Sequence, residues 1–284
     1  MTSHPGGYYL PSPSHWPIVG STGLFCMALG GVLLMNGSAG VGTVILLAGV
    51  AILIYMMFGW FGTVIRESES GKFNKQVDIS FRWGMSWFIF SEVMFFAAFF
   101  GALFYMRVLA VPWLTEADTA QLLWPNFKGG WPASGPGIEG TFNPMGAWGI
   151  PAINTLILLS SGVTVTIAHW GLKKNNRTQL NLFLFFTFVL GILFLSLQAR
   201  EYIHAYESLN LTLKTGAYGA TFFMLTGFHG FHVTIGTIML IVVWLRCLKG
   251  HFKPEHHFAF EGVSWYWHFV DVVWLGLFVF VYWL

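Results

Sequence analysis

Seven apolar runs, each long enough to cross a lipid bilayer, constrain the fold of this chain more than any other feature. A membrane-spanning helix needs about 20 apolar residues, and inside lipid every backbone polar group must be paired within its own segment. None of the runs alternates as a barrel strand does. The sequence therefore predicts an all-α integral membrane protein with seven transmembrane helices, at about residues 17–36, 40–64, 81–108, 151–170, 180–203, 217–246 and 259–283.

The scarcity of charge supports a membrane location. Only 9% of the 284 residues are Asp, Glu, Lys or Arg, against roughly 25% in soluble domains. This composition excludes a disordered chain, a nucleic-acid-binding protein and an ordinary cytosolic enzyme. Cys26 and Cys247 lie far apart in apolar runs, so neither a disulfide framework nor a cysteine-based metal site is expected.

Basic residues in the short connections predict the orientation. Ten of the 14 lie on one side if there are seven spans, and such a bias marks the cytoplasmic or matrix face, which would also hold the N-terminus. These ten are Arg66, Lys72, Lys75, Arg82, Lys173, Lys174, Arg177, Arg246, Lys249 and Lys253.

The chain is expected to have three parts. Residues 1–64 comprise an N-terminal tail and the first two helices, 65–80 form an inner loop, and 81–284 form a five-helix bundle. Within the bundle, an outer loop over 109–150 is rich in Pro, Gly and Trp. A loop of this length has either a covering or a binding role: packing on neighbouring subunits and a dedicated docking site are both open.

Glu92 stands out because it lies inside the third apolar run. Its neighbours on the helix are Phe88, Phe95, Phe96 and Phe99, which favour the neutral acid over the carboxylate. A charge at this depth costs about 2.5–3.5 kcal/mol. We expect a neutral carboxyl that donates a hydrogen bond to another helix or to a lipid. A proton-relay or lipid-contact role and a purely structural hydrogen bond are both open.

The seventh run carries a polar stripe. Glu261, Ser264, His268 and Asp271 are spaced by three, four and three residues, which places them on one helix face. His268 and Asp271 are close enough to pair, whereas Glu261 needs a partner from another helix.

Two histidines in the sixth run, His229 and His232, raise the question of haem. Haem ligation in a bundle needs suitably placed imidazoles, whereas the glycines flanking His229 are typical of helix packing. Interhelical hydrogen bonding is therefore the preferred interpretation, with no metal ligated by this chain.

At the expected inner interface, basic and aromatic side chains flank several spans. They could hold anionic lipid head groups or reflect charge sorting alone. The residues are Trp60, Arg66, Arg246, His256 and His257.

Several of these segments together resemble subunit III of the haem-copper cytochrome c oxidases, along essentially the whole chain. The resemblance is carried by Pro11-Ser12-Pro13 with Trp16-Pro17, Val64-Ile65-Arg66-Glu67-Ser68, Ser91-Glu92-Val93-Met94-Phe95-Phe96, Gly227-Phe228-His229-Gly230-Phe231-His232-Val233, His256-His257-Phe258, and Trp265-Tyr266-Trp267-His268-Phe269-Val270-Asp271-Val272-Val273-Trp274.

The resemblance implies a subunit of a proton-translocating, aa3-type cytochrome c oxidase with no redox centre and no catalytic residue of its own. Its first two helices would be splayed from the other five by a cleft that holds phospholipids. The carboxyl matching Glu92 would lie near this cleft, and positions matching Trp60, Arg66, Arg246 and His256 would contact lipid. Implied roles are stabilising subunit I, supporting its proton uptake and turnover, and lining a lipid route for oxygen.

The implied partners are subunit I as the main contact, which holds the haem and copper, then subunit II and a small subunit IV. Cytochrome c would be the substrate of the complex. This chain departs from the animal pattern at Lys72, Phe73 and Lys75, and its loop 109–150 is longer. The longer loop favours a bacterial plasma membrane with a cytoplasmic N-terminus, the mitochondrial inner membrane being the alternative.

Two other classes of function are open from the residues alone. A transporter or channel would use Glu92, Glu261, His268 and Asp271 as an ion path, but the chain has no internal repeat of the kind that many transporters show. A haem-bearing electron-transfer subunit would need the histidines as ligands.

Overall fold

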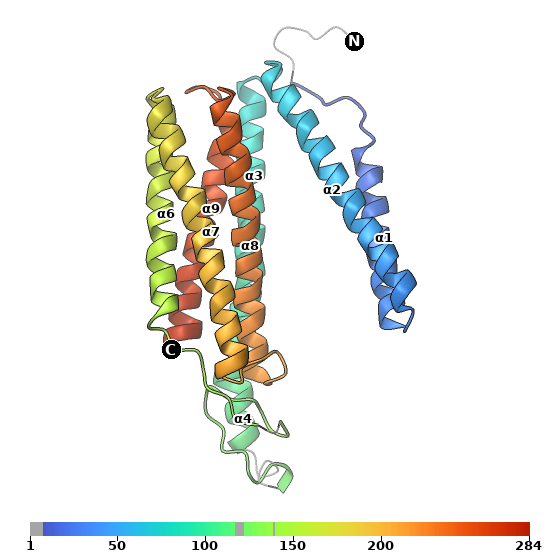
Figure 1. The fold of residues 1–284 in the computed structure, drawn as a ribbon, viewed down its shortest axis with the longest axis vertical. Coiled ribbons are helices and arrows are strands. Elements are labelled where there is room, and N and C mark those ends of the chain that lie inside the picture. The colour runs from blue at the N-terminus through green and yellow to red at the C-terminus, as the bar shows by residue number, and fades with distance from the viewer. Residues whose placement is uncertain (1–7, 117–121, 139) are drawn as a thin grey trace. The chain divides into compact units, whose positions relative to one another are not determined.

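A computed structural model describes residues 8–116, 122–138 and 140–284. Seven of the helices in these ranges are long and apolar enough to cross a membrane, as the apolar runs predict, and no strand occurs there beyond one bridge between Lys253 and His256. The all-α fold class is thus confirmed (Figure 1). The helices are α1 (Trp16–Met35), α2 (Ala39–Glu69), α3 (Lys75–Phe104), α6 (Ile150–Lys173), α7 (Arg177–Ser208), α8 (Ala217–Leu248) and α9 (Phe258–Leu277).

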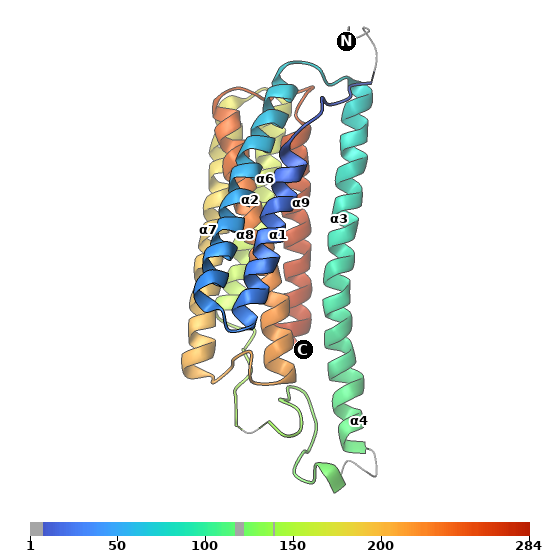
Figure 2. The same cartoon turned by 90° about the vertical axis from the view of Figure 1, so that its right-hand side faces the viewer.

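The bounds expected for the inner loop and for the long outer loop need correction, because the helices extend beyond the apolar runs. α2 and α3 leave only residues 70–74 between them, not 65–80. α3 continues through the π-helical turn η1 (Tyr105–Ala110) into α4 (Val111–Glu116) (Figure 2), so the long connection begins after 116, not at 109. Lipid requires apolar side chains only at hydrocarbon depth, and backbone hydrogen bonds carry a helix beyond it. Residues 117–121 and 139 of this loop lie outside the described ranges.

The chain divides into two compact units after Phe81. In the first unit, α1 and α2 pack through glycines. A Cβ atom on Gly30 would lie 2.5 Å from the backbone nitrogen of Leu46, and one on Gly49 would lie 2.7 Å from that of Met27. Small residues let membrane helices approach to backbone contact.

Aromatic rings pack at the start of α1 and between the non-helical segments of this unit. The Trp16 ring contacts Gly59, and its indole nitrogen donates to Thr63 Oγ1 at 3.4 Å. Tyr9 packs against Phe73 with ring centroids 5.3 Å apart, and Lys72 Nζ lies 5.9 Å from the Tyr9 centroid. Lys72 and Phe73, two of the positions that depart from the animal pattern, therefore contact Tyr9 of the N-terminal tail.

In the second unit, Trp267 of α9 is the centre of the core. Its ring is fully buried, and its indole nitrogen donates to Ser161 Oγ of α6 at 2.9 Å. Gly191 of α7 and Gly236 of α8 leave space for the ring, because a Cβ on either would come within 3 Å of it. One tryptophan thus contacts three helices, of which α6 and α8 pack directly against α9 (Figure 1).

α3 joins this bundle through long side chains. The Phe95 ring packs on Phe228 of α8 at 5.1 Å between centroids, and Phe96 packs on Phe269 of α9 at 6.0 Å. α9 itself ends in a second π-helical turn, η2 (Phe278–Trp283). These ring contacts place the polar side chains of α3 opposite those of α8 and α9.

Candidate functional site: an acid–imidazole pair between α3 and α8

Glu92 of α3 and His232 of α8 form a direct pair across two helices. Glu92 Oε2 lies 2.9 Å from His232 Nε2, and the other ring nitrogen, Nδ1, lies 2.6 Å from the carbonyl oxygen of Phe228. The side chains are 21% and 11% exposed. Of the two partners left open for Glu92 by the sequence, another helix or a lipid, the structure provides the first, an imidazole of α8.

The hydrogen bonds determine where the protons lie. A carbonyl oxygen only accepts, so Nδ1 must carry the proton that it donates to Phe228. Nε2 is then either an acceptor, with Glu92 protonated, or a donor, with Glu92 ionised and His232 cationic. In both states the pair shares one proton and has no net charge, which suits its depth in an apolar span.

Aromatic rings surround the pair. Phe96 lies 4.9 Å and Phe95 5.8 Å from the His232 ring, and Tyr266 of α9 stacks at 6.3 Å. The Tyr266 hydroxyl donates to the backbone oxygen of His232 at 3.4 Å. The rings hold the imidazole in place and leave the carboxyl partly open.

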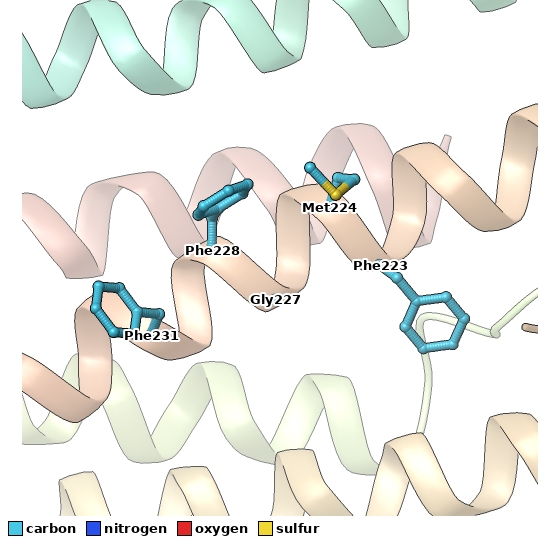
Figure 3. A pocket seen from close by; sticks show the side chains of 5 residues that line it. All are labelled: Phe223, Met224, Gly227, Phe228 and Phe231. Atoms are coloured by element: carbon cyan, nitrogen blue, oxygen red, sulfur yellow. The ribbon is translucent and has the colours of Figure 1, made fainter. Parts of the chain in front are cut away.

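An apolar hollow of about 350 Å³ adjoins these rings on α8. Phe228 contacts Phe95 of α3, whereas Phe223 packs on Tyr202 of α7 at 5.1 Å. Figure 3 shows these two rings projecting from α8 in different directions. The hollow is lined by Phe223, Met224, Gly227, Phe228 and Phe231, a lining suited to hydrocarbon.

The polar stripe of α9 divides between two neighbouring helices. Glu261 contacts Arg82 of α3 as an ion pair. His268 Nδ1 lies 3.6 Å from Asp271 Oδ2, and its Nε2 lies 3.3 Å from Thr166 Oγ1 of α6. Since the Thr166 hydroxyl donates to the Gly162 carbonyl, it accepts from His268.

The predicted inner-interface residues of the second unit have different surroundings. Arg246 is buried, with its guanidinium 4.4 Å from the Phe252 centroid. His257 is also buried and contacts His169 of α6, the two Nε2 atoms being 3.3 Å apart. His256 is exposed. Arg246 and His257 therefore contact protein as well as any head group.

In the first unit, Trp60 and Arg66 are both exposed on α2. Arg66 Nη2 donates to Thr63 Oγ1 at 3.0 Å. This bond orients the guanidinium and leaves its other donors open to an anion.

His229 lies deeper than His232. Its ring is fully buried between Phe194 and Trp274, and its Nε2 donates to the Val270 carbonyl of α9 at 3.1 Å. Among the described residues, no three His, Cys, Asp or Glu side chains gather in a way that could hold a metal ion.

Sequence reasoning missed another acid within a span, the buried Glu201 of α7. It is 1% exposed, and it accepts from Tyr282 of η2 at 2.6 Å and from Gln198 at 3.3 Å. The signal was present, because Glu201 lies within the apolar run at 180–203. The rule that singled out Glu92 applies to it equally.

Comparison with known proteins gives the family of the chain. Residues 4–284 match the family described as cytochrome c oxidase subunit III. The chain belongs to this family. Its relatives named cytochrome c oxidase subunit 3 include those of Marchantia polymorpha, 44% identical over 99% of this chain and 96% of the relative, and Hippopotamus amphibius, 42% identical over 100% and 99%. The relative from Triticum aestivum is 42% identical over 97% and 96%.

Family membership makes the chain a multi-pass membrane component of an oxidase complex with other subunits. The resemblance carried by the sequence motifs is thereby confirmed. Glu92 and His232, in two of those motifs, form the pair described above.

Proposed function

We propose that this chain serves its oxidase as a non-catalytic subunit that binds phospholipids, stabilises subunit I and supports proton uptake and sustained turnover there. The observation that carries the proposal is the Glu92–His232 pair, a neutral polar contact whose neighbouring ring Phe95 packs on Phe228, a residue that lines an apolar hollow. A neutral hydrogen-bonding pair can contact a lipid ester or head group without placing a net charge in hydrocarbon.

The separation of the polar clusters argues against an ion path through the chain. In the described part of the structure, no hydrogen bond joins the Glu92–His232 pair to His268 or Asp271. The second ring nitrogen of His232, Nδ1, instead donates to the backbone oxygen of Phe228 on its own helix. A proton relay would need a connected series of titratable groups.

The exposed side chains of α2 support a second lipid contact. Arg66 has guanidinium donors available beyond its bond to Thr63, and Trp60, on the same helix, is 41% exposed. An arginine and an interfacial tryptophan are a combination suited to an anionic head group. Arg246, His256 and His257 are proposed as contacts of the same kind in the second unit.

The proposal includes the wider assembly. Subunit I would be the main contact and would hold the haem and copper of an aa3-type centre, with subunit II and a small subunit IV as further neighbours and cytochrome c as the electron donor. Mild-detergent purification through a tag on this chain tests it: haem and copper chains should co-purify with phospholipid. Recovery of the chain alone would contradict the assembly. A haem absorption band in the visible spectrum of the isolated chain would contradict its lack of a redox centre.

Glu92→Ala tests the lipid role. We expect the initial rate of oxygen reduction to stay close to wild type, while phospholipid retained per complex falls and activity decays faster during turnover. Glu207→Ala is the matched control, since Glu207 is an exposed acid of α7. Immediate loss of activity in a normally assembled Glu92→Ala complex would contradict the proposal.

A further inference from the structure

The buried cluster of Glu201, Gln198 and Tyr282 leaves two oxygen atoms without a partner. Tyr282 O–H and Gln198 Nε2 both donate to Glu201 Oε1, at 2.6 Å and 3.3 Å. Glu201 Oε2 and Gln198 Oε1 are buried, and neither has a hydrogen-bond partner. Buried polar atoms in native proteins are nearly always paired, so these two oxygen atoms need an explanation.

The charge environment of Glu201 adds to the problem. Among the described residues, no Lys, Arg or His forms an ion pair with this carboxyl. The titratable groups that face it are phenols: Tyr282 of η2, Tyr218 of α8 and Tyr202 of its own helix. An ionised Glu201 would therefore be a buried charge without a counter-ion, which proteins avoid.

One proton satisfies both oxygen atoms. If Oε2 carries it, the resulting O–H can donate to Gln198 Oε1, either directly or through one water molecule. Together with the existing bond from Gln198 Nε2 to Oε1, this completes the two-bond pairing of a carboxylic acid with an amide. If the Gln198 amide, whose orientation is an assignment, were rotated, its oxygen would lie 3.3 Å from Oε1, and a proton on Oε1 would join the two.

We propose that Glu201 is a proton-binding site, a carboxyl held protonated by its pairing with Gln198. The neutral acid joins α7 to the π-helical turn η2 through Tyr282, so the end of the last span is held without a buried charge. Such turns often occur at functional sites, and here η2 places the phenol against the carboxyl. The site is distinct from Glu92, which shares its proton with an imidazole.

Infrared spectroscopy of the intact oxidase complex, with carboxyl-labelled glutamate, tests the proposal. The wild-type minus Glu201→Gln difference spectrum should contain a carbonyl stretch of a protonated carboxyl, present at neutral and at moderately alkaline pH. Glu207→Gln, which alters an exposed acid of the same helix, should leave that band in place. A pair of carboxylate stretches in its stead, or loss of the band at moderately alkaline pH, would overturn the proposal.

Tyr282→Phe provides a second, independent measurement if Glu201→Gln does not assemble. Removing the phenol takes one donor from Oε1, so the protonated carbonyl band should move to higher frequency without disappearing. A shift confined to carboxylate stretches, or no shift at all, would show that Glu201 is not the protonated group.

Discussion

The proton shared by Glu92 and His232 determines how each side chain behaves towards reagents and substitutions. The carboxyl carries this proton in one of its two states, and its side chain is 21% exposed. Glu201 is only 1% exposed, and Glu261 is ion-paired with Arg82. Three acids in or near the spans thus differ in exposure and in hydrogen-bond partner.

A hydrophobic carbodiimide, which attacks protonated carboxyls in apolar surroundings, should distinguish these acids. We expect it to label Glu92 and to spare Glu201, which is shielded, and Glu261, which is paired with a cation. Peptide mapping by mass spectrometry identifies the labelled residues. Labelling confined to acids of the loops would refute the neutral-acid interpretation of Glu92.

At the residue scale, the sequence could single out an acid but not its partner. Glu92 was found because it interrupts an apolar run, and the same rule would have found Glu201. That His232 is the partner of Glu92 depends on how α3 and α8 are rotated, since the two residues are 140 positions apart in the chain.

At the scale of the elements, the glycines of α1 and α2 determine how closely the helices pack. Gly30 and Gly31 are neighbours on α1, but only Gly30 faces Leu46 of α2, and a Cβ on Gly31 would meet nothing within 4 Å. The two positions offer a matched pair of substitutions on one helix.

Gly30→Ala should destabilise the α1–α2 pair by about 1–3 kcal/mol, the usual range for overpacking. The cause is its Cβ, which would lie 2.5–2.8 Å from Leu46 atoms. Gly31→Ala should be neutral or slightly stabilising, because alanine is the better helix former. Thermal midpoints of the purified complexes measure both effects. Equal midpoints for the two variants would contradict the glycine contact.

Asn176 provides a second comparison at this scale, because it caps the start of α7. Its Oδ1 accepts from the backbone nitrogen of Gln179 at 3.1 Å. Asn176→Ala should cost about 1 kcal/mol, while Asn176→Asp, which keeps an acceptor, should cost little. Denaturant titration of the purified protein compares them. If both variants lost the same stability, the cap would not be the cause.

At the scale of the whole molecule, orientation follows from where the basic residues lie. Lys173, Lys174 and Arg177 lie in or at the ends of the α6–α7 connection, whereas the α7–α8 connection carries Lys214. This asymmetry predicts that the first connection faces the cytoplasm or matrix and the second faces the opposite side.

Cysteine labelling checks that orientation. In intact cells or mitoplasts, a membrane-impermeant maleimide should modify Lys214→Cys and should reach Asn175→Cys only after the membrane is opened. The native Cys26 and Cys247 lie within α1 and α8, and the parent protein without added cysteine provides the background. Labelling in the reverse order would place the N-terminus on the other side.

The sequence by itself determined the seven spans, the membrane class, the basic face and the family, because each is a property of a local segment. A helix that crosses the hydrocarbon core of a bilayer needs a long apolar run. That run can be recognised in the sequence without knowing which helices pack beside it. Its limits are approximate, because helices continue past the hydrocarbon, as α2 and α3 do.

Only the tertiary structure decided which side chains meet. Arg82 and Glu261 form an ion pair although they are 179 positions apart in the chain. Glu201 of α7 bonds to Tyr282, which lies 81 positions later in η2. Helix rotation and spacing decide such contacts, and they depend on rings such as Trp267 fitting beside glycines of other helices. Complementarity of this kind is spread over several segments, so no single apolar run contains it.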